Sequence, residues 1–175
     1  MVHYFKKMKC LFILLCVVFH LNGGSRMKLI SNAFKNGQEM PMEFTGEGEN
    51  ISPDLLWQEV PANTKSFVLI VDDPDAPSKT WVHWVLYNIP ASVRQLERDS
   101  YKGLLGINSN GRVAYDGPMP PSGKHRYFFK LYALDLIINV SSNPTKEMVE
   151  QAMKGHVLAE GQLMGTYELK KNKKK

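Results

Sequence analysis

Three apolar segments constrain the fold of this chain more than any other feature of its sequence. SFVLIVDD (66–73), WVHWVLYNIP (81–90) and HRYFFKLYALD (125–135) are rich in β-branched and aromatic residues and are bounded by Pro, Gly and Asp, a pattern typical of strands. The first two contain runs of consecutive apolar residues, which indicate burial on both faces. GQLMGTYEL (161–169) predicts a further strand. We therefore expect a mainly β domain.

One helix is predicted near the C-terminus. Asn143 is a suitable N-cap, Pro144 suits the first helical turn, and Gly155 suits the end of the helix. The apolar residues expected on its buried face are Met148, Val149, Ala152 and Met153. The segments 46–57 and 102–123 carry Gly, Pro, Asn and Ser at short intervals and predict loops.

Length and charge distribution limit the function classes. The 175 residues are enough for one domain with a substantial core and too few for two ordinary domains. The formal net charge of +5 comes from the ends, because residues 6–9 carry three lysines and residues 170–175 carry five, and without these eight the chain carries −3. A lysine-rich tail is typical of a solvated end. Basic and aromatic residues do not alternate along a strand as base stacking requires, so we expect no nucleic-acid partner.

The N-terminus has the pattern of a signal peptide. A basic start, HYFKKMK, precedes the apolar run CLFILLCVVFHL and the small residues NGGS. We expect residues 1–25 to form this peptide, with cleavage near Gly24 or Ser25, and residues 26–169 to form the domain before the tail at 170–175. Because the apolar run is shorter than the roughly 20 residues that span a bilayer, the mature chain is expected to be periplasmic or secreted, without stable membrane insertion.

Two alternatives remain open at this end of the chain. Met27 opens MKLISNAF, and a start there would give a cytoplasmic protein. Cys16 would suit a lipid attachment, although the bulky Leu15 stands before it. Because Cys10 and Cys16 are the only cysteines, a domain cleaved after them would have no thiol and no disulfide.

Several partial motifs fail on spacing. GPMPPSGKH imitates a phosphate-binding loop, but five residues separate its glycines, and His125 stands where Ser or Thr would hold magnesium. DDPDAP imitates a calcium loop, but the required glycine and glutamate positions hold Ser78 and Trp84. Ser122 near His125 does not resemble a nucleophile elbow. We therefore expect no metal and no cofactor.

Two remaining motifs carry a family resemblance. DPDAP followed by WVHW, and then YDGPMPPSGKHRYFFKLYALD, resemble the signature regions of the phosphatidylethanolamine-binding protein family, whose bacterial branch is often labelled Raf-kinase-inhibitor-like. The resemblance extends through GENISPDLLW and GHVLAEGQLMGTYEL, so it covers roughly residues 28–169. It implies a β-sandwich of that family's type, with a small pocket at one end for phosphate-like groups.

The resemblance also implies which residues line this pocket. The implied anion-binding residues are Asp73, Asp75, Pro77, His83, Gly117, Pro121, His125 and Tyr127. The family often has a cis proline in its first motif, which corresponds to the bond between Ala76 and Pro77. A tyrosine that relatives place after this motif is absent from the short connection at 78–80, so the lipid and kinase preferences of eukaryotic members do not transfer directly.

The aspartates cannot contact a phosphate directly without a cost, because bare carboxylates repel phosphate by about 1 kcal/mol at 4 Å in water. We therefore expect them to act through a neighbouring side chain. A carboxylate that accepts a proton from one ring nitrogen of a histidine orients the ring and favours its charged form, so that the other nitrogen donates to an anion. We expect Asp75 to act in this way, beside His83, His125, the Tyr127 hydroxyl and a backbone amide near Gly117. The alternative places His83 in a tryptophan-lined core and the aspartates in turns.

These observations predict a noncatalytic anion-binding module that recognises a phosphate-like or carboxylate group and modulates a protein partner. One alternative is an inhibitor of a protease or a kinase that acts through its outer surface. Another is a small-ester hydrolase in which His83 and Asp75 perform acid–base chemistry. A homodimer remains open.

Overall fold

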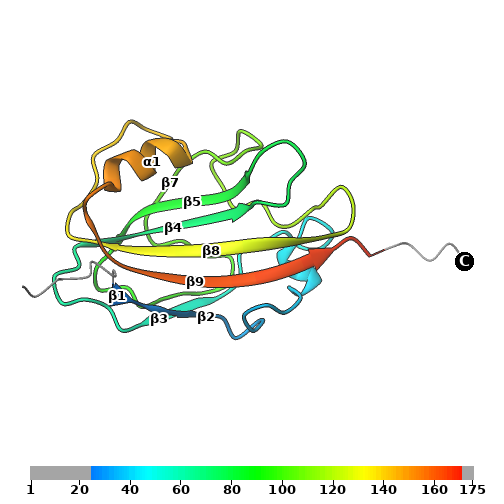
Figure 1. Ribbon diagram of the computed structural model, residues 1–175, viewed down its shortest axis with the longest axis horizontal. Coiled ribbons are helices and arrows are strands. Elements are labelled where there is room, and N and C mark those ends of the chain that lie inside the picture. Colours follow the sequence, from blue (N-terminus) through cyan, green and yellow to red (C-terminus); the bar gives the residue numbers. More distant parts are fainter. Residues whose placement is uncertain (1–24, 171–175) are drawn as a thin grey trace, which may run out of the picture.

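The computed structural model describes residues 25–170, which form two packed β-sheets (Figure 1). The six-stranded sheet contains, in spatial order, β1 (Ser25–Arg26), β9 (Val157–Glu168), β8 (Lys124–Leu134), β4 (Ser66–Asp73), β5 (Trp81–Pro90) and β7 (Leu104–Leu105). The three-stranded sheet contains β2 (Lys28–Ile30), β3 (Leu55–Gln58) and β6 (Gln95–Leu96). The described residues also form a 3-10 helix, η1 (Met42–Phe44), and one α-helix, α1 (Lys146–Met153).

This arrangement confirms the predicted mainly β sandwich with a helix near the C-terminus. The strands β4 and β5 have the bounds that their apolar runs predicted. The signal peptide and the lysine-rich tail lie outside the described residues, apart from Ser25 and Lys170.

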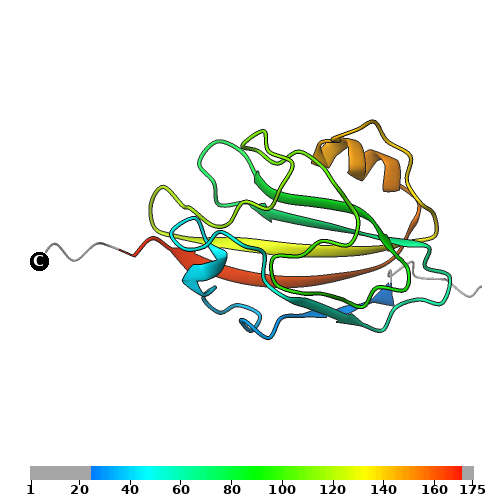
Figure 2. The same ribbon diagram turned by 180° about the vertical axis from the view of Figure 1, so that it is seen from behind.

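The central strand β4 is buried on both faces, as its unbroken apolar run predicted. Successive side chains of a strand point to opposite faces. Phe67 and Leu69 therefore lie in the core between the two sheets with Trp57 of β3, whereas Val68 belongs to a second core beneath α1 with Val149. Figures 1 and 2 show α1 on one side of the large sheet and β2 and β3 on the other.

The start of α1 differs from its prediction. The N-cap is Thr145, whose side chain accepts a hydrogen bond from the Met148 amide at 3.4 Å. Asn143 instead has a φ of 54°, a left-handed conformation that asparagine tolerates in turns. The Pro144 carbonyl accepts a hydrogen bond from the Ile107 amide at 2.9 Å. This contact holds the predicted cap and first turn against the neighbouring loop, outside the helix.

The buried face of α1 is narrower than predicted. Val149 and Met153, one turn apart, are buried, whereas Met148 is 42% exposed. The two buried residues pack on the helix side of β4 and β5. No helix within residues 25–170 is long and apolar enough to cross a bilayer.

Two predicted loops contain strands. Within 46–57, Leu55 and Trp57 of β3 are buried, and they pair with β6 and β2 respectively. Within 102–123, β7 pairs with β5. These strands were missed because each is short and is flanked by Gly, Pro or Asn, which dominate a local reading of the pattern. Conversely, β9 begins at Val157, before the predicted 161.

Candidate functional site

Two connections build a hollow at one end of the sandwich. The β4–β5 connection and the segment that leads into β8 both lie at the end where β9 finishes (Figure 1). The hollow has a volume of about 430 Å³. It is lined by Asp73, Ala76, Pro77, Ser78, Trp81, His83, Asn110, Gly117, Met119, Pro120, Pro121 and Tyr127. Every residue of the predicted site except Asp75 and His125 therefore lines this hollow.

The end of β4 separates two neighbouring carboxylates. Because strand side chains alternate, Asp72 contacts Lys130 and Lys146, whereas Asp73 lines the hollow. Pro74 has no N–H to continue the ladder, and the chain turns as the Asp75 amide donates to Asp73 Oδ1 at 2.8 Å. The connection thus begins with a hydrogen bond that orients the Asp73 carboxylate.

The predicted cis bond between Ala76 and Pro77 is wrong. None of the peptide bonds within residues 25–170 is cis. The trans form of an X–Pro bond is favoured by about 0.5–1 kcal/mol, and the β4–β5 connection accommodates it.

His125 lies behind Asp73 rather than on the wall of the hollow. Its Nδ1 is 2.7 Å from Asp73 Oδ2, and the two side chains are 8% and 5% exposed. With the Asp75 amide on the other oxygen, both oxygens of the Asp73 carboxylate have partners within the protein. The pair therefore holds the carboxylate in place, and His125 supports the site from outside the lining.

Asp75 does not act through a histidine, contrary to prediction. Its carboxylate accepts hydrogen bonds from Arg126 Nε at 2.8 Å, from Arg126 Nη2 at 2.7 Å and from the Arg126 amide at 3.0 Å. These hydrogen bonds hold the pKa of Asp75 below its ordinary value. The sequence contained a signal for this pairing with Arg126. Arg126 immediately follows His125, and strand alternation turns the two side chains to opposite faces. Asp75 therefore ties the β4–β5 connection to the start of β8.

A β-bulge carries His83 into the hollow. The register pairs Val71 with Trp84 and Asp72 with Val82, so His83 is the additional residue on β5. Bulges re-aim side chains near functional sites. His83 Nδ1 lies 2.6 Å from the Asp116 carbonyl oxygen. The histidine is 5% exposed.

The charge state of His83 also differs from prediction. Its ring contacts a backbone carbonyl rather than a carboxylate. Burial lowers the pKa of His83, although the neighbouring acceptor and carboxylates oppose this effect. In the ligand-free protein this lowered pKa favours the neutral form of His83, whereas the sequence suggested a positively charged donor.

Gly117 is required by packing rather than by ligand access to its amide. Its N–H donates to Asn50 Oδ1 at 2.7 Å, so this amide is not the free donor that was predicted. A Cβ at this position would lie 2.4 Å from the Phe44 carbonyl oxygen. Asn50 also donates to Asp116 Oδ1 at 3.3 Å. One asparagine thus fixes two successive residues of the segment that leads into β8.

Two polar atoms of the lining residues are buried without partners. His83 Nε2 and the Tyr127 hydroxyl make no hydrogen bond to any other described residue. Their rings meet edge to face at 5.2 Å between centroids. Burial, together with Asp73 and Asp75, raises the pKa of Tyr127, so its hydroxyl keeps its proton. Because buried polar groups are nearly always hydrogen-bonded, this pair indicates a place for a polar ligand atom.

The residues that sequence reasoning missed fall into two groups. The additional lining residues are Ala76, Ser78, Trp81, Asn110, Met119 and Pro120. Most of them lie within or beside the two recognised motifs, so proximity was the available signal. Asn50, which positions the wall, lies in GENISPDLLW, but its partners are 66 and 67 residues away. No local pattern predicts such contacts.

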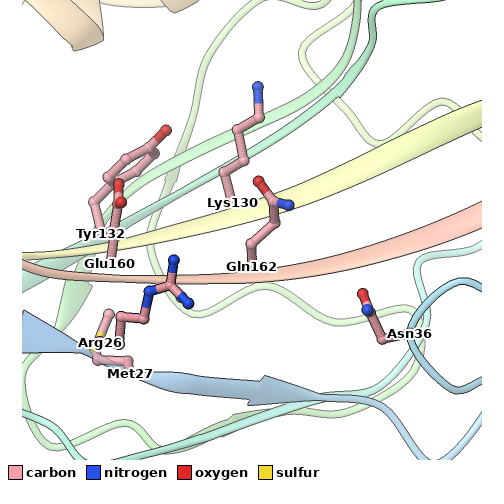
Figure 3. Close-up of a pocket in the computed structure, with 8 residues that line it drawn as sticks. Arg26, Met27, Asn36, Lys130, Tyr132, Glu160 and Gln162 are labelled. Atoms are coloured by element: carbon pink, nitrogen blue, oxygen red, sulfur yellow. The ribbon is translucent and has the colours of Figure 1, made fainter.

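A second hollow of about 430 Å³ lies on the outer face of β8 and β9 (Figure 3). Arg26, Lys130, Tyr132, Glu160 and Gln162 contribute polar side chains to it. None of the buried polar atoms without partners within residues 25–170 belongs to its lining. The same described residues contain no cluster of three or more His, Cys, Asp or Glu side chains able to hold a metal ion. The hollow beside His83 is therefore the stronger candidate.

Comparisons with known proteins identify a matching family model and similar proteins. Residues 30–168 match the family described as phosphatidylethanolamine-binding protein. A UPF0098 protein of Methanothermobacter thermautotrophicus is 47% identical over 148 residues, covering 81% of this chain and 98% of that protein. A second, from Aquifex aeolicus, is 46% identical over 155 residues, covering 83% and 91%.

Two solved structures share the fold. A phosphatidylethanolamine-binding protein homologue from Chlamydia trachomatis has a TM-score of 0.80 and 40% identity, covering 83% of this chain and 99% of its own. YbcL of Escherichia coli, described as a member of the mammalian PEBP family, has a TM-score of 0.77 and 34% identity, covering 83% and 100%.

Proposed function

Because this chain belongs to the phosphatidylethanolamine-binding protein family, we propose that it is a noncatalytic binding protein whose hollow takes a small phosphate-like or carboxylate group. Binding of that group would modulate a protein partner. Membership of the family supports the coarser statement that the chain is a ligand-binding module. The ligand class and the partner are the parts that we propose.

One observation carries the ligand proposal. Within the described residues, His83 Nε2 and the Tyr127 hydroxyl are both buried without a partner, and both residues line a hollow of about 430 Å³. Leaving a buried polar group unpaired costs about 1–3 kcal/mol, so ligand oxygens that contact these atoms would recover part of this energy. At about 430 Å³, the hollow lies near the lower end of the size range of small-molecule pockets, about 300–1,000 Å³.

The contacts favour binding over hydrolysis. A general-base histidine in a nucleophilic mechanism is usually oriented by a carboxylate, whereas His83 is held by a backbone carbonyl. The predicted partner Asp75 is committed to Arg126. Ser78 is the serine of the lining, and among the described residues its hydroxyl makes no hydrogen bond to His83. These contacts do not assemble an activated nucleophile.

The rim of the hollow suits contact with a protein partner. Met119 lines the hollow and is 57% exposed, and Pro121 beside it is also exposed. A partner that covers this rim would contact apolar protein surface and the bound group together. The affinity of the partner would then depend on whether the hollow is occupied.

We also propose that residues 1–25 are a cleaved signal peptide, so that the domain acts outside the cytoplasm. The support is the order of a basic start, an apolar run and small residues. A start at Met27 remains the competing proposal, and a determination of the N-terminus distinguishes the two.

The variant Tyr127→Phe tests the ligand proposal. It removes only a hydroxyl that has no partner among residues 25–170, so the free protein should unfold at the same or a slightly higher denaturant concentration. Methyl phosphate should bind the original protein and stabilise it, by about 2.7 kcal/mol at a hundred times its Kd. The variant should bind it more weakly.

Tyr132→Phe is the matched control, because Tyr132 lies in the separate hollow of Figure 3. This variant should bind methyl phosphate with the affinity of the original protein. Equal binding by both variants would show that the Tyr127 hydroxyl does not contact the ligand. Turnover of a panel of small esters, lost in His83→Ala, would contradict the noncatalytic proposal.

A further inference from the structure

The hydrogen bond of His83 determines which ring nitrogen carries its proton. Nδ1 lies 2.6 Å from the carbonyl oxygen of Asp116, and a carbonyl oxygen can only accept. Nδ1 must therefore carry the hydrogen. In a neutral imidazole the other nitrogen then has a lone pair and acts as an acceptor. Nε2, the atom without a partner among the described residues, is therefore a buried acceptor.

The surroundings of the ring keep it neutral. Burial lowers the pKa of His83, and the nearby carboxylates do not reverse this effect. The titratable groups that face His83 are the carboxylates of Asp72, Asp73 and Asp116 and the hydroxyl of Tyr127. The Asp73 carboxylate pairs with His125, and the Asp116 carboxylate accepts from Asn110 and Arg112. These pairings offset part of the attraction that the carboxylates exert on a proton at Nε2.

The described residues that line the hollow include no lysine and no arginine. Two guanidinium groups outside the lining are paired with carboxylates, that of Arg126 with Asp75 and that of Arg112 with Asp116. A fully ionised oxyanion in the hollow would place its lone pairs against the lone pair of Nε2, with the Asp73 carboxylate nearby. It would have only the Tyr127 hydroxyl as a buried side-chain donor. The geometry therefore disfavours an oxyanion that brings no hydrogen of its own.

Building on the proposed function, we propose that the hollow binds its oxyanion in a singly protonated form, with the ligand's own O–H donating to His83 Nε2. Tyr127 then donates its hydroxyl hydrogen to a second oxygen of the ligand. A phosphate monoester monoanion has both kinds of oxygen, because its second pKa is about 6. A sulfate monoester has no ionisable proton near neutral pH and would leave Nε2 facing a lone pair. The site thus selects phosphoryl over sulfuryl groups of the same shape and size.

The discrimination has a measurable size. An unsatisfied buried acceptor weakens binding by about tenfold to a hundredfold. The phosphate ester should also lose affinity about tenfold per pH unit above its second pKa, near 6, because only the monoanion carries the required hydrogen. An alkyl phosphonate, whose second pKa is higher, should bind to correspondingly higher pH. The position of the pH profile should therefore follow the ligand.

Calorimetric titration of methyl phosphate, methyl phosphonate and methyl sulfate between about pH 5.5 and 8.5 tests the inference. We expect both phosphoryl compounds to bind, the phosphonate to retain affinity at higher pH, and the sulfate to bind at least about tenfold more weakly at pH 6. Sulfate binding equal to that of the phosphate would overturn this inference while leaving the anion-binding function intact. Binding of none of the three would overturn the phosphate-like part of the proposed function, and this inference with it.

Nitrogen NMR of the protein labelled at histidine provides an independent readout. In the complex with methyl phosphate, Nδ1 of His83 should be protonated and Nε2 should show the shift of an unprotonated, hydrogen-bonded nitrogen. Protons on both nitrogens would mean that His83 is a donor, and the inference would be wrong. His156, an exposed histidine whose Nδ1 is 2.9 Å from Asp135 Oδ1, is the control, because its signals should not respond to the ligand.

Discussion

Replacing Gly117 with alanine tests whether this glycine is required by packing. The added Cβ would lie 2.4 Å from the Phe44 carbonyl oxygen, 2.8 Å from Thr45 Cα and 2.9 Å from Asn50 Oδ1. The first two are backbone atoms, which cannot rotate away, so the segment must move relative to η1. Overpacking of this kind costs about 1–3 kcal/mol. Each kcal/mol corresponds to about 2–4 °C in the Tm of a domain of about 150 residues.

Gly46→Ala is the matched control for this substitution. The three atoms nearest to its Cβ would all belong to the Met119 side chain, with Sδ at 3.2 Å, and Met119 is 57% exposed. Neither glycine has a positive φ, so left-handed backbone strain does not enter the comparison. We expect the control to change the free energy of unfolding by no more than about 0.5 kcal/mol.

Urea unfolding of both variants, followed by titration with methyl phosphate, measures the effect. Gly117→Ala should unfold at a lower urea concentration and should bind methyl phosphate more weakly, because Gly117 itself lines the hollow. Equal unfolding midpoints for the two variants would refute the packing argument. Normal stability with lost binding would instead show that the ligand approaches the Gly117 backbone directly.

Three further predictions concern other parts of the chain. The hydrogen bonds from Arg126 lower the pKa of Asp75, so their contribution is present above the ordinary aspartate pKa and disappears as the pH falls through the lowered value. Unfolding midpoints of Arg126→Met and the original protein should therefore converge at acidic pH, and a constant difference would contradict this. Lys146→Met removes one of the two lysines that pair with Asp72, whose side chain is 1% exposed. It should lower the free energy of unfolding, but by less than the roughly 3–5 kcal/mol typical when a sole partner is lost. An unchanged urea midpoint would show that this ion pair does not stabilise α1. Expressed from its native start in a bacterial host, the chain should carry a new N-terminus within residues 22–27, and an intact Met1 on sequencing would exclude cleavage.

Local sequence patterns were sufficient for the central strands, and the family resemblance of two motifs indicated most of the residues that gather at the hollow. The apolar runs of β4 and β5 predicted both their bounds and their burial, because a strand covered on both faces needs no alternation. The motifs around Asp73 and His125 brought together most of the predicted lining. Such features are encoded within a few consecutive residues and can be recognised without knowing the neighbours.

Local patterns failed where a competing long-range contact decided the structure. Asn143 had the properties of a helix cap, yet the Ile107 amide holds the adjacent Pro144 carbonyl and α1 begins after Thr145. The strand β3 was missed because it follows a turn-rich segment. Its pairing with β2 and β6 stabilises an extended conformation that its own residues do not predict.

The chemistry of the candidate site was decided by tertiary structure alone. The family resemblance of two sequence motifs implied that carboxylates, histidines and a tyrosine would meet at one end of a β-sandwich. It could not determine that Asp75 pairs with Arg126, that Asp73 pairs with His125, or that His83 donates to a backbone carbonyl. Partner choice depends on strand register, on the bulge at His83 and on burial, and these are properties of the packed sheets rather than of any single segment.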